Sequence, residues 1–236
     1  VSAAAWVTWK LGEPTVEATL QADQLAITLI ERELSIPIDS LSLQATLQQQ
    51  RNRWTVFADD IALVKDGVSL ELPRVQLDSW GDSLRLRAAQ VQLAQVNAIA
   101  VDLPVVPPNL ADVLAILQPE GWLKRVQFSL DDYRDLSRNW NLEANFDGVA
   151  VQSWKGAPGV KSGQGYLNLR PGSGEVVVDS QQFSLEFPAL YKNALFYDEL
   201  YGTINIDWDR EGLSLTSGLL TASGVEGTAQ ALFGLD

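Results

Sequence analysis

The chain has 236 residues and a formal net charge of −13, and 46% of its residues are hydrophobic. That hydrophobic fraction is ordinary for a globular protein and argues against disorder. The negative charge argues against a nucleic-acid partner, because no basic patch is available to neutralise phosphates, and against adsorption on an anionic membrane surface. The length fits one large β domain or two smaller lobes.

The sequence contains no Cys, His or Met. Disulfides, Ser-His and Cys-His nucleophile systems and the usual zinc sites are therefore excluded. We expect no enzyme activity, no cofactor and no metal site. The absence of Met indicates a piece of a longer protein, and the apolar opening at residues 1–7 is too short to span a bilayer, which takes about 20 residues.

Apolar and polar residues alternate from Thr15 onward. This pattern predicts β-strands with one apolar face and one solvent-exposed face. Turn signals at Asp66-Gly67 and Gly81-Asp82 separate some of the runs and predict an antiparallel meander. The apolar positions of the first half are Val16, Ala18, Leu20, Leu25, Ile27, Leu29, Leu34, Ile36, Ile38, Leu41, Leu43, Ala45, Leu47, Trp54, Val56, Ala58, Ile61, Leu63, Val68, Leu70, Leu72, Leu84 and Leu86.

The prolines of residues 102–108 cannot lie in a central strand and predict a linker. A short helix is expected next, over Asn109–Gln118, with Asn109 as its N-cap. Its apolar stripe comes from Leu110, Val113, Leu114 and Leu117 and is expected to cover a sheet end. We therefore expect a first β lobe at residues 1–103, a linker with the helix at 104–122, and a second β lobe at 123–236.

The second lobe again alternates, and the run from Tyr166 to Asp179 predicts a β-hairpin that turns at Pro171-Gly172. On the order of fifteen strands and one short helix are expected in total, an all-β fold. Trp140 and Trp208 are in phase with the apolar positions of their strands, which favours core or groove packing over a sugar-binding platform.

Three motifs with known chemistry are better explained as turns or edges. Residues 156–162 are glycine-rich, but Val160 stands where a phosphate-binding loop needs Gly. Residues 207–212 begin like a calcium-binding loop, but Gly218 occupies the position of the bidentate Glu. The carboxylate pairs Asp59-Asp60 and Asp131-Asp132 are neighbours along strands and would point to opposite faces, unlike a glycosidase pair.

Glycine-rich corners around the predicted hairpin, and the aromatic residues after it, form a distinctive pattern. It consists of Trp154, Gly156-Ala157-Pro158-Gly159 (the WKGAPG motif with Lys155), Gly163, Gly165, Leu167, Leu169, Gly172, Gly174, Ser180, Phe183-Ser184-Leu185, Phe187-Pro188-Ala189-Leu190-Tyr191, Leu200-Tyr201-Gly202-Thr203-Ile204 and Trp208. The pattern resembles that of YhdP-type members of the AsmA-like family, specifically over about residues 146–208 and more weakly elsewhere.

The resemblance implies a large periplasmic protein of the Gram-negative envelope, anchored in the inner membrane by a segment outside this chain. It also implies bridge-like phospholipid transport toward the outer membrane. Alternation alone leaves two architectures open, because a groove and a closed β-sandwich give the same pattern. The resemblance favours a long curled antiparallel sheet that forms a U-shaped hydrophobic groove. The alternative is a non-catalytic sandwich that serves as a binding or scaffold domain of an envelope protein.

If the groove exists, its concave side is expected to carry acyl chains. The expected partners are phospholipid acyl chains and the remaining segments of the same longer chain, with the fragment itself a monomer. The expected lining residues are Leu25, Ile27, Leu29, Leu84, Leu86, Leu142, Phe146, Leu167, Leu169, Phe183, Leu185, Ile204 and Ile206.

Overall fold

A computed structural model describes residues 1–10, 13–29, 34–101, 103, 108–132, 134–135, 138–154, 158–188, 191–209, 212–225 and 227–235, with the side chains of 9, 10, 13, 27, 29, 34, 108–110, 213 and 235 left out. The strands are β1 Ser2–Lys10, β2 Glu13–Leu29, β3 Leu34–Gln50, β4 Arg53–Lys65, β5 Val68–Trp80, β6 Ser83–Gln92, β7 Glu120–Leu130, β8 Trp140–Val151, β9 Gly159–Arg170, β10 Ser173–Glu186, β11 Leu195–Trp208, β12 Leu213–Ser217, β13 Leu220–Gly224, β14 Gly227–Ala231 and β15 Gly234–Leu235. The helices are α1 Leu93–Ala100 and α2 Pro108–Leu117.

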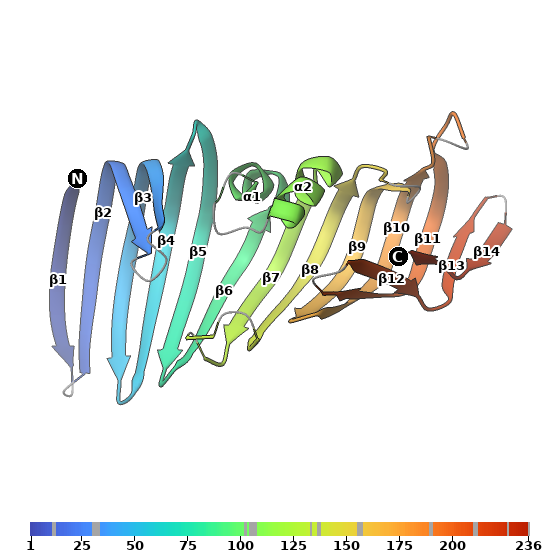
Figure 1. The fold of residues 1–236 in the computed structure, drawn as a ribbon. Helices are drawn as coiled ribbons and strands as arrows, with labels where there is room; N and C mark the ends of the chain where they lie inside the picture. Colours follow the sequence, from blue (N-terminus) through green and yellow to red (C-terminus); the bar gives the residue numbers. More distant parts are fainter. Residues whose placement is uncertain are drawn as a thin grey trace.

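All described strands belong to one 15-stranded sheet in which each strand pairs antiparallel with its neighbours (Figure 1). The order follows the chain from β1 to β12, and β11 also pairs with β13, so the sheet branches at its C-terminal end. Within the described residues β1 pairs only with β2, and the sheet is not closed into a barrel. The predicted all-β fold is confirmed, and a sandwich of two packed sheets is wrong for this part of the chain.

The predicted turns are also present. Asp66 and Gly67, both with positive φ, join β4 to β5, and Pro171-Gly172 join β9 to β10. Strand β6 pairs directly with β7, so the sheet is continuous across the helical segment. Residues 104–107, where the linker was expected, lie outside the described residues, and the division into two lobes stays a prediction.

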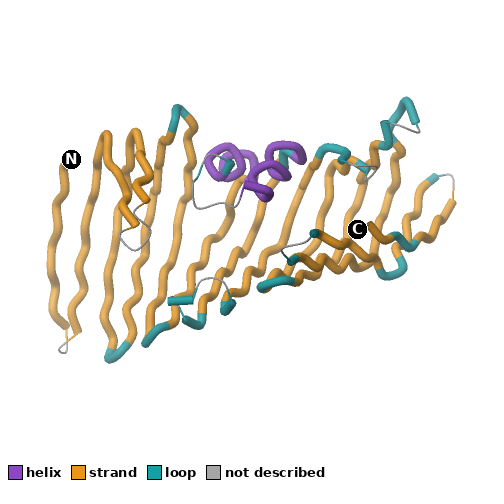
Figure 2. The backbone as a smooth tube through the Cα atoms, in the orientation of Figure 1, coloured by secondary structure: helices purple, strands orange, loops and turns teal. Residues whose placement is uncertain are grey.

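Two helices are present among the described residues where the sequence predicted one (Figure 2). The second, α2, matches the expected helix, but it begins at Pro108, so Asn109 lies inside the first turn and the N-cap prediction was wrong. The helix α1 was missed because its sequence, LAQVNAIA, continues the apolar character of β6 without a capping residue. Gln92 precedes it and makes no side-chain capping hydrogen bond.

Helix α1 lies against the apolar side of the sheet, and α2 packs beside α1. Helix α1 contacts β5, β6 and β7 and also α2. On the strands beside α1, Glu71 and Lys124 of the opposite face are exposed, whereas Leu72 and Leu123 of the apolar face are half-buried. Helix α1 therefore covers one margin of the apolar face, at the end of β6 and the beginning of β7. Figure 1 shows α2 beside it at the same end of the strands.

Each strand from β2 to β11 contains one break in its alternation, where two consecutive residues both point to the outer, polar face. In β4, for example, Ala58 pairs with Ala45 and Leu63 pairs with Leu41, although the two β4 residues are an odd number apart. The bulge at Asp59 and Asp60, with φ 49° at Asp60, restores the apolar face beyond the break. These breaks, here called the crease, are opposite one another on β2–β3, on β4 to β7 and on β10–β11, and they are offset along the strands where the register shifts, between β3 and β4 and from β7 to β10. They are residues 23–24, 39–40, 59–60, 73–74, 89–90, 124–125, 147–148, 161–162, 181–182 and 198–199.

The crease explains how such long strands keep one apolar side. Residues at the crease are mostly exposed and many are charged, and ion pairs join neighbours along it, as between Arg74 and Asp59 and between Lys124 and Asp147. A bulge bends its strand and increases the local twist. The breaks, which step along the strands at the register shifts, therefore bend the sheet as they cross it, with the polar residues on the outside of the bend.

The molecule is thin for its mass. Its accessible surface is 15044 Å², whereas a compact monomer of 25.9 kDa would expose about 10,500 Å². Few apolar side chains are fully buried, and one cluster of them, Ala88, Val126 and Ala144, joins β6, β7 and β8. Most apolar-face side chains are half-buried, as expected for a sheet without a second layer over it.

On the outer face, Asp78 ties β4, β5 and β6 together. Its carboxylate is fully buried and accepts hydrogen bonds from Arg53 at 3.2 Å, Thr55 at 2.8 Å, Gln76 at 2.9 Å and Arg87 at 3.1 Å. Burial by itself raises the pKa of Asp78, but the hydrogen bonds from Thr55 and Arg53 and the charges of Arg53 and Arg87 outweigh it and hold that pKa below its ordinary 3.8.

We expect Asp78→Ala to lower the free energy of unfolding by about 2 kcal/mol, since both arginines lose their buried partner while remaining partly hydrated. Because the folded-state pKa is lowered, the carboxylate stabilises the fold fully above the unfolded pKa, and this contribution is lost as pH falls through the folded value. The stability difference between wild type and Asp78→Asn should thus shrink below about pH 4. Urea unfolding from pH 7 downward measures this, with exposed Asp179→Asn as the control; a constant difference would contradict it.

At Gly165 the surrounding groups leave no room for a side chain. A Cβ on this residue (φ +154°) would lie 2.0 Å from the carbonyl oxygen of Val177 and 2.6 Å from Cζ of Phe146, whose ring lies over the glycine. We expect Gly165→Ala to cost on the order of 3 kcal/mol of unfolding free energy. Gly212→Ala is the matched control, because no heavy atom lies within 4 Å of its added Cβ. Equal urea midpoints for the two variants would contradict this.

Candidate functional site

One unbroken row of apolar residues crosses the sheet from β1 to β12. Residues paired across antiparallel strands point to the same face, so the register alone defines the row. It runs through Val7, Val16, Leu47, Val56, Leu77, Leu86, Phe128, Leu142, Leu169, Gly174, Ile206 and Leu215. At about 4.8 Å per strand the row measures about 50 Å.

Further rows on both sides of the crease extend the same face, here called the apolar face. Next to the crease several of its side chains are small, as with Ala22 on β2, Ala58 on β4 and Ala88 on β6. Small side chains suit the inside of a bend, where neighbouring groups crowd together. The apolar face therefore continues across the bend without interruption.

The register places every predicted lining residue whose side chain is described on this face. Leu86 and Leu142 lie in the row above, and Leu84 lies in the next row of the same face, with Leu130 and Trp140. Leu167 pairs with Val176 and so with Ile204. The remaining ones are Leu25, Phe146, Leu169, Phe183, Leu185 and Ile206. The side chains of Ile27 and Leu29 lie outside the described residues, and the role of the whole set in binding stays a prediction.

Only one charged side chain lies on the apolar face among the described residues of β2 to β11. Lys65, at the end of β4, is 7% exposed and forms an ion pair with Asp66 in the turn. The chain carries 17 Lys and Arg and 30 Asp and Glu, so their near absence from one face is a strong bias. Such a surface can bind apolar molecules but has little to offer a charged ligand.

Three aromatic rings stack along the margin of the apolar face that lies away from the helices. The ring centroids of Phe128 and Trp140 are 6.4 Å apart, and those of Trp140 and Trp208 are also 6.4 Å apart, with interplanar angles of 25° and 22°. Gly174, next to this aromatic stack, makes room for Leu169, since a Cβ there would lie 2.5 Å from Cδ2 of Leu169. The predicted packing role of both tryptophans on the apolar side is confirmed.

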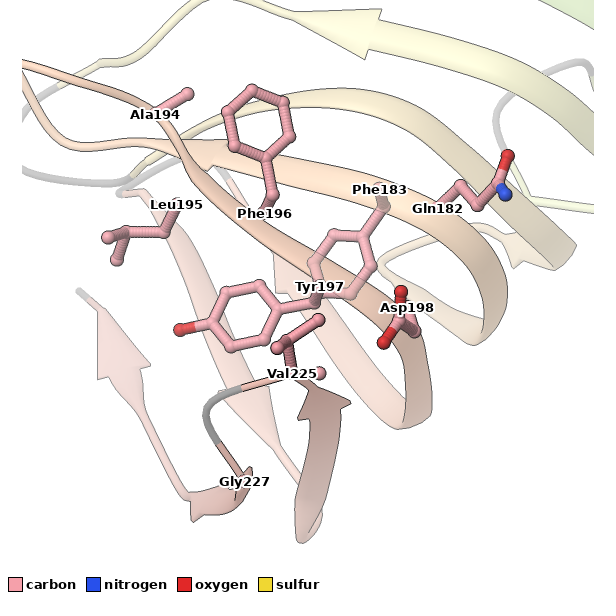
Figure 3. Close-up of a pocket in the computed structure, with 10 residues that line it drawn as sticks. Gln182, Phe183, Ala194, Leu195, Phe196, Tyr197, Asp198, Val225 and Gly227 are labelled. Carbon is pink, nitrogen blue, oxygen red and sulfur yellow. The ribbon is translucent and has the colours of Figure 1, made fainter.

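A cavity of about 530 Å³ opens where the sheet branches, between β11 and the β13–β14 hairpin. Figure 3 shows Phe196 on one side of β11 and Tyr197 on the other, near Val225. The Tyr197 ring stacks on Phe183 of the apolar face at 5.3 Å. Sequence analysis missed this cavity because it depends on the branch, which the alternation does not reveal.

In the described part of the chain, no cluster of three or more His, Cys, Asp and Glu side chains is arranged to hold a metal ion. Neither described helix has the length and hydropathy of a membrane-spanning helix. At the calcium-loop-like segment, Asp209 accepts a hydrogen bond from the backbone N–H of Gly212, as in a turn.

A family model described as YhdP protein matches residues 1–233 of the chain. The chain belongs to the YhdP family. This family consists of AsmA-like proteins of the cell envelope that are associated with lipid transport rather than catalysis. No curated protein and no solved structure matches the chain. The apolar face described above is the candidate lipid-binding surface of this YhdP-family chain.

Proposed function

We propose that the chain carries phospholipid acyl chains along its apolar face, as part of a bridge between the inner and outer membranes of a Gram-negative envelope. The observation that supports this most is the uninterrupted apolar row from β1 to β12 on an unclosed sheet. Membership of a family associated with lipid transport favours a lipid as the molecule that the apolar face binds.

The energetics favour a continuous surface of this kind. Each methylene transferred from an apolar environment to water costs about 0.8 kcal/mol, so a phospholipid with two acyl chains faces a barrier on the order of 20 kcal/mol in free diffusion. A surface without charged interruptions lets the chains stay in apolar contact as they move. The charged outer face and the net charge of −13 keep the carrier itself hydrated.

The same proposal includes a periplasmic location and a longer protein. The outer edge of β1 has no partner among the described residues, and an unpaired strand edge is a template for further strands. We propose that other segments of the longer chain extend the sheet there and that one of its ends reaches the inner membrane. The isolated chain would then bind lipid as a monomer without bridging two membranes.

Mass spectrometry of organic extracts of the purified protein tests the proposal. We expect co-purified phospholipid, or uptake of phospholipid from vesicles when the preparation is lipid-free. Absence of both, for a protein with an intact β circular dichroism spectrum, would contradict the proposed function and favour a scaffold role.

A further inference from the structure

The two margins of the apolar face are chemically different. One is covered by α1, with α2 beside it, and their sequences LAQVNAIA and PNLADVLAIL are dominated by apolar residues. The opposite margin lies at the ends of β7 and β11 and the start of β8, and it carries the aromatic stack of Phe128, Trp140 and Trp208. No described helix contacts β8 to β11 with more than isolated pairs of residues.

The aromatic stack follows the margin over several strands. Phe128 is on β7, Trp140 on β8 and Trp208 on β11, and the rings of the two tryptophans meet across the tip of the β9–β10 hairpin. The hairpin tip is held there by a hydrogen bond of 3.0 Å from the backbone N–H of Trp208 to the carbonyl of Gly172. All three rings are half-buried, so each has an apolar contact on one side and remains partly accessible.

Beyond the aromatic stack the chain becomes charged. The loop after β7 begins with Asp131, and Arg134 in that loop forms an ion pair with Asp82 of the β5–β6 turn. Arg170 at the end of β9 and Asp209 after β11 are exposed. On β11 the surface thus changes from aliphatic Ile206 to aromatic Trp208 and then to Asp209, whereas on β7 Leu130 lies between Phe128 and Asp131.

This order of chemistry matches the boundary between the acyl chains and the headgroup of a phospholipid. Trp is enriched at the membrane–water interface, because its ring has an apolar body and a polar N–H. We infer that the rings of Phe128, Trp140 and Trp208 contact the glycerol-ester region of a bound glycerophospholipid, an inference that rests on the proposed function. The headgroup then leaves the groove at this margin, and the acyl chains point along the strands toward the crease and the helices.

Depth-dependent fluorescence quenching tests the inference. The protein is loaded with phosphatidylcholine that carries bromine either near the ester end or near the terminal methyl of its acyl chain. The emission of Trp140 and of Trp208 is obtained as the difference between wild type and Trp140→Phe or Trp208→Phe, variants that keep an aromatic ring in the stack. We expect about twofold or more stronger quenching by the ester-proximal bromine, since the rings lie at headgroup level.

Trp122→Phe is the control, because Trp122 is on the outer face and its emission should respond to neither lipid. Stronger quenching by the methyl-terminal bromine, or equal quenching by both, would contradict the inferred contact with the ester region without contradicting lipid binding. Absence of quenching with lipid bound, as shown by mass spectrometry of the same sample, would assign the stack a purely structural role. Failure to load any lipid would instead count against the proposed function.

Discussion

An Ile204→Asp variant is expected to keep its fold but to bind much less phospholipid per protein than the wild type. Ile204 is half-buried and lies on the apolar face between Val176 and Ser217. An aspartate there can stay hydrated, so the expected loss of unfolding free energy is about 1–2 kcal/mol, the aliphatic burial that is removed. For an acyl chain, however, the carboxylate and its water replace an apolar contact in the middle of the path.

The matched control is Asn205→Asp, one residue along the same strand. Asn205 is exposed on the outer face, so this variant makes the same change in net charge without touching the apolar face. Phospholipid per protein is measured by mass spectrometry and the fold by circular dichroism during heating. If Ile204→Asp unfolds the chain outright, the position belongs to a sealed core; if both variants carry equal lipid, the apolar face is not the path.

Deleting Asp60 is expected to have the largest effect on stability of any single change considered. Without the bulge, regular alternation would turn Ile61 and Leu63 of β4 to the outer face and break their match with Leu72 and Leu70 of β5. Exposing two such side chains costs about 1.5–3 kcal/mol each, and Lys65 would turn over with them. A loss on the order of 5 kcal/mol is comparable to the whole stability of many domains.

Deletion of Asn52 provides the comparison, since Asn52 is an exposed residue of the β3–β4 turn and its loss leaves the crease intact. Denaturant unfolding and the recovery of soluble protein report the outcome. We expect the Asn52 deletion to remain folded with a modest shift in midpoint. Equal behaviour of the two deletions would show that the crease does not keep the apolar residues on one side.

Much of this architecture follows from alternation. Val16, Ala18 and Leu20 predicted a strand with one apolar face, and the pairing of such strands in chain order follows from short turns such as Asp66-Gly67. What alternation could not show is that Val16–Leu20 and Leu25–Leu29 are halves of a single strand, β2. Two polar residues between apolar runs look like a turn in sequence, whereas here they form a bulge within a continuous strand.

The helix α1 and the branch at β11 were not predictable for a different reason. The sequence of α1 has strand-compatible apolar residues and no capping signal, so its helical state depends on packing against β5, β6 and β7. The branch depends on Gly202, where a Cβ would lie 2.4 Å from Cδ2 of Leu220. The glycine was noticed in the sequence as part of the family pattern, but its partner is distant along the chain and only the fold brings them together.

Because of the crease, the length of this sheet and the width of its apolar face are set independently, whereas in a closed barrel the number of strands sets the diameter. In a barrel, adding strands widens the lumen, because the circumference is made of strands. Here the bend is made within each strand, by its own pair of outward residues, so the width of the apolar face on each side of the bend is set by where the break falls along a strand. Additional strands that carry a bulge at the same position would lengthen the bent sheet without changing its width, so its length and its width can vary independently.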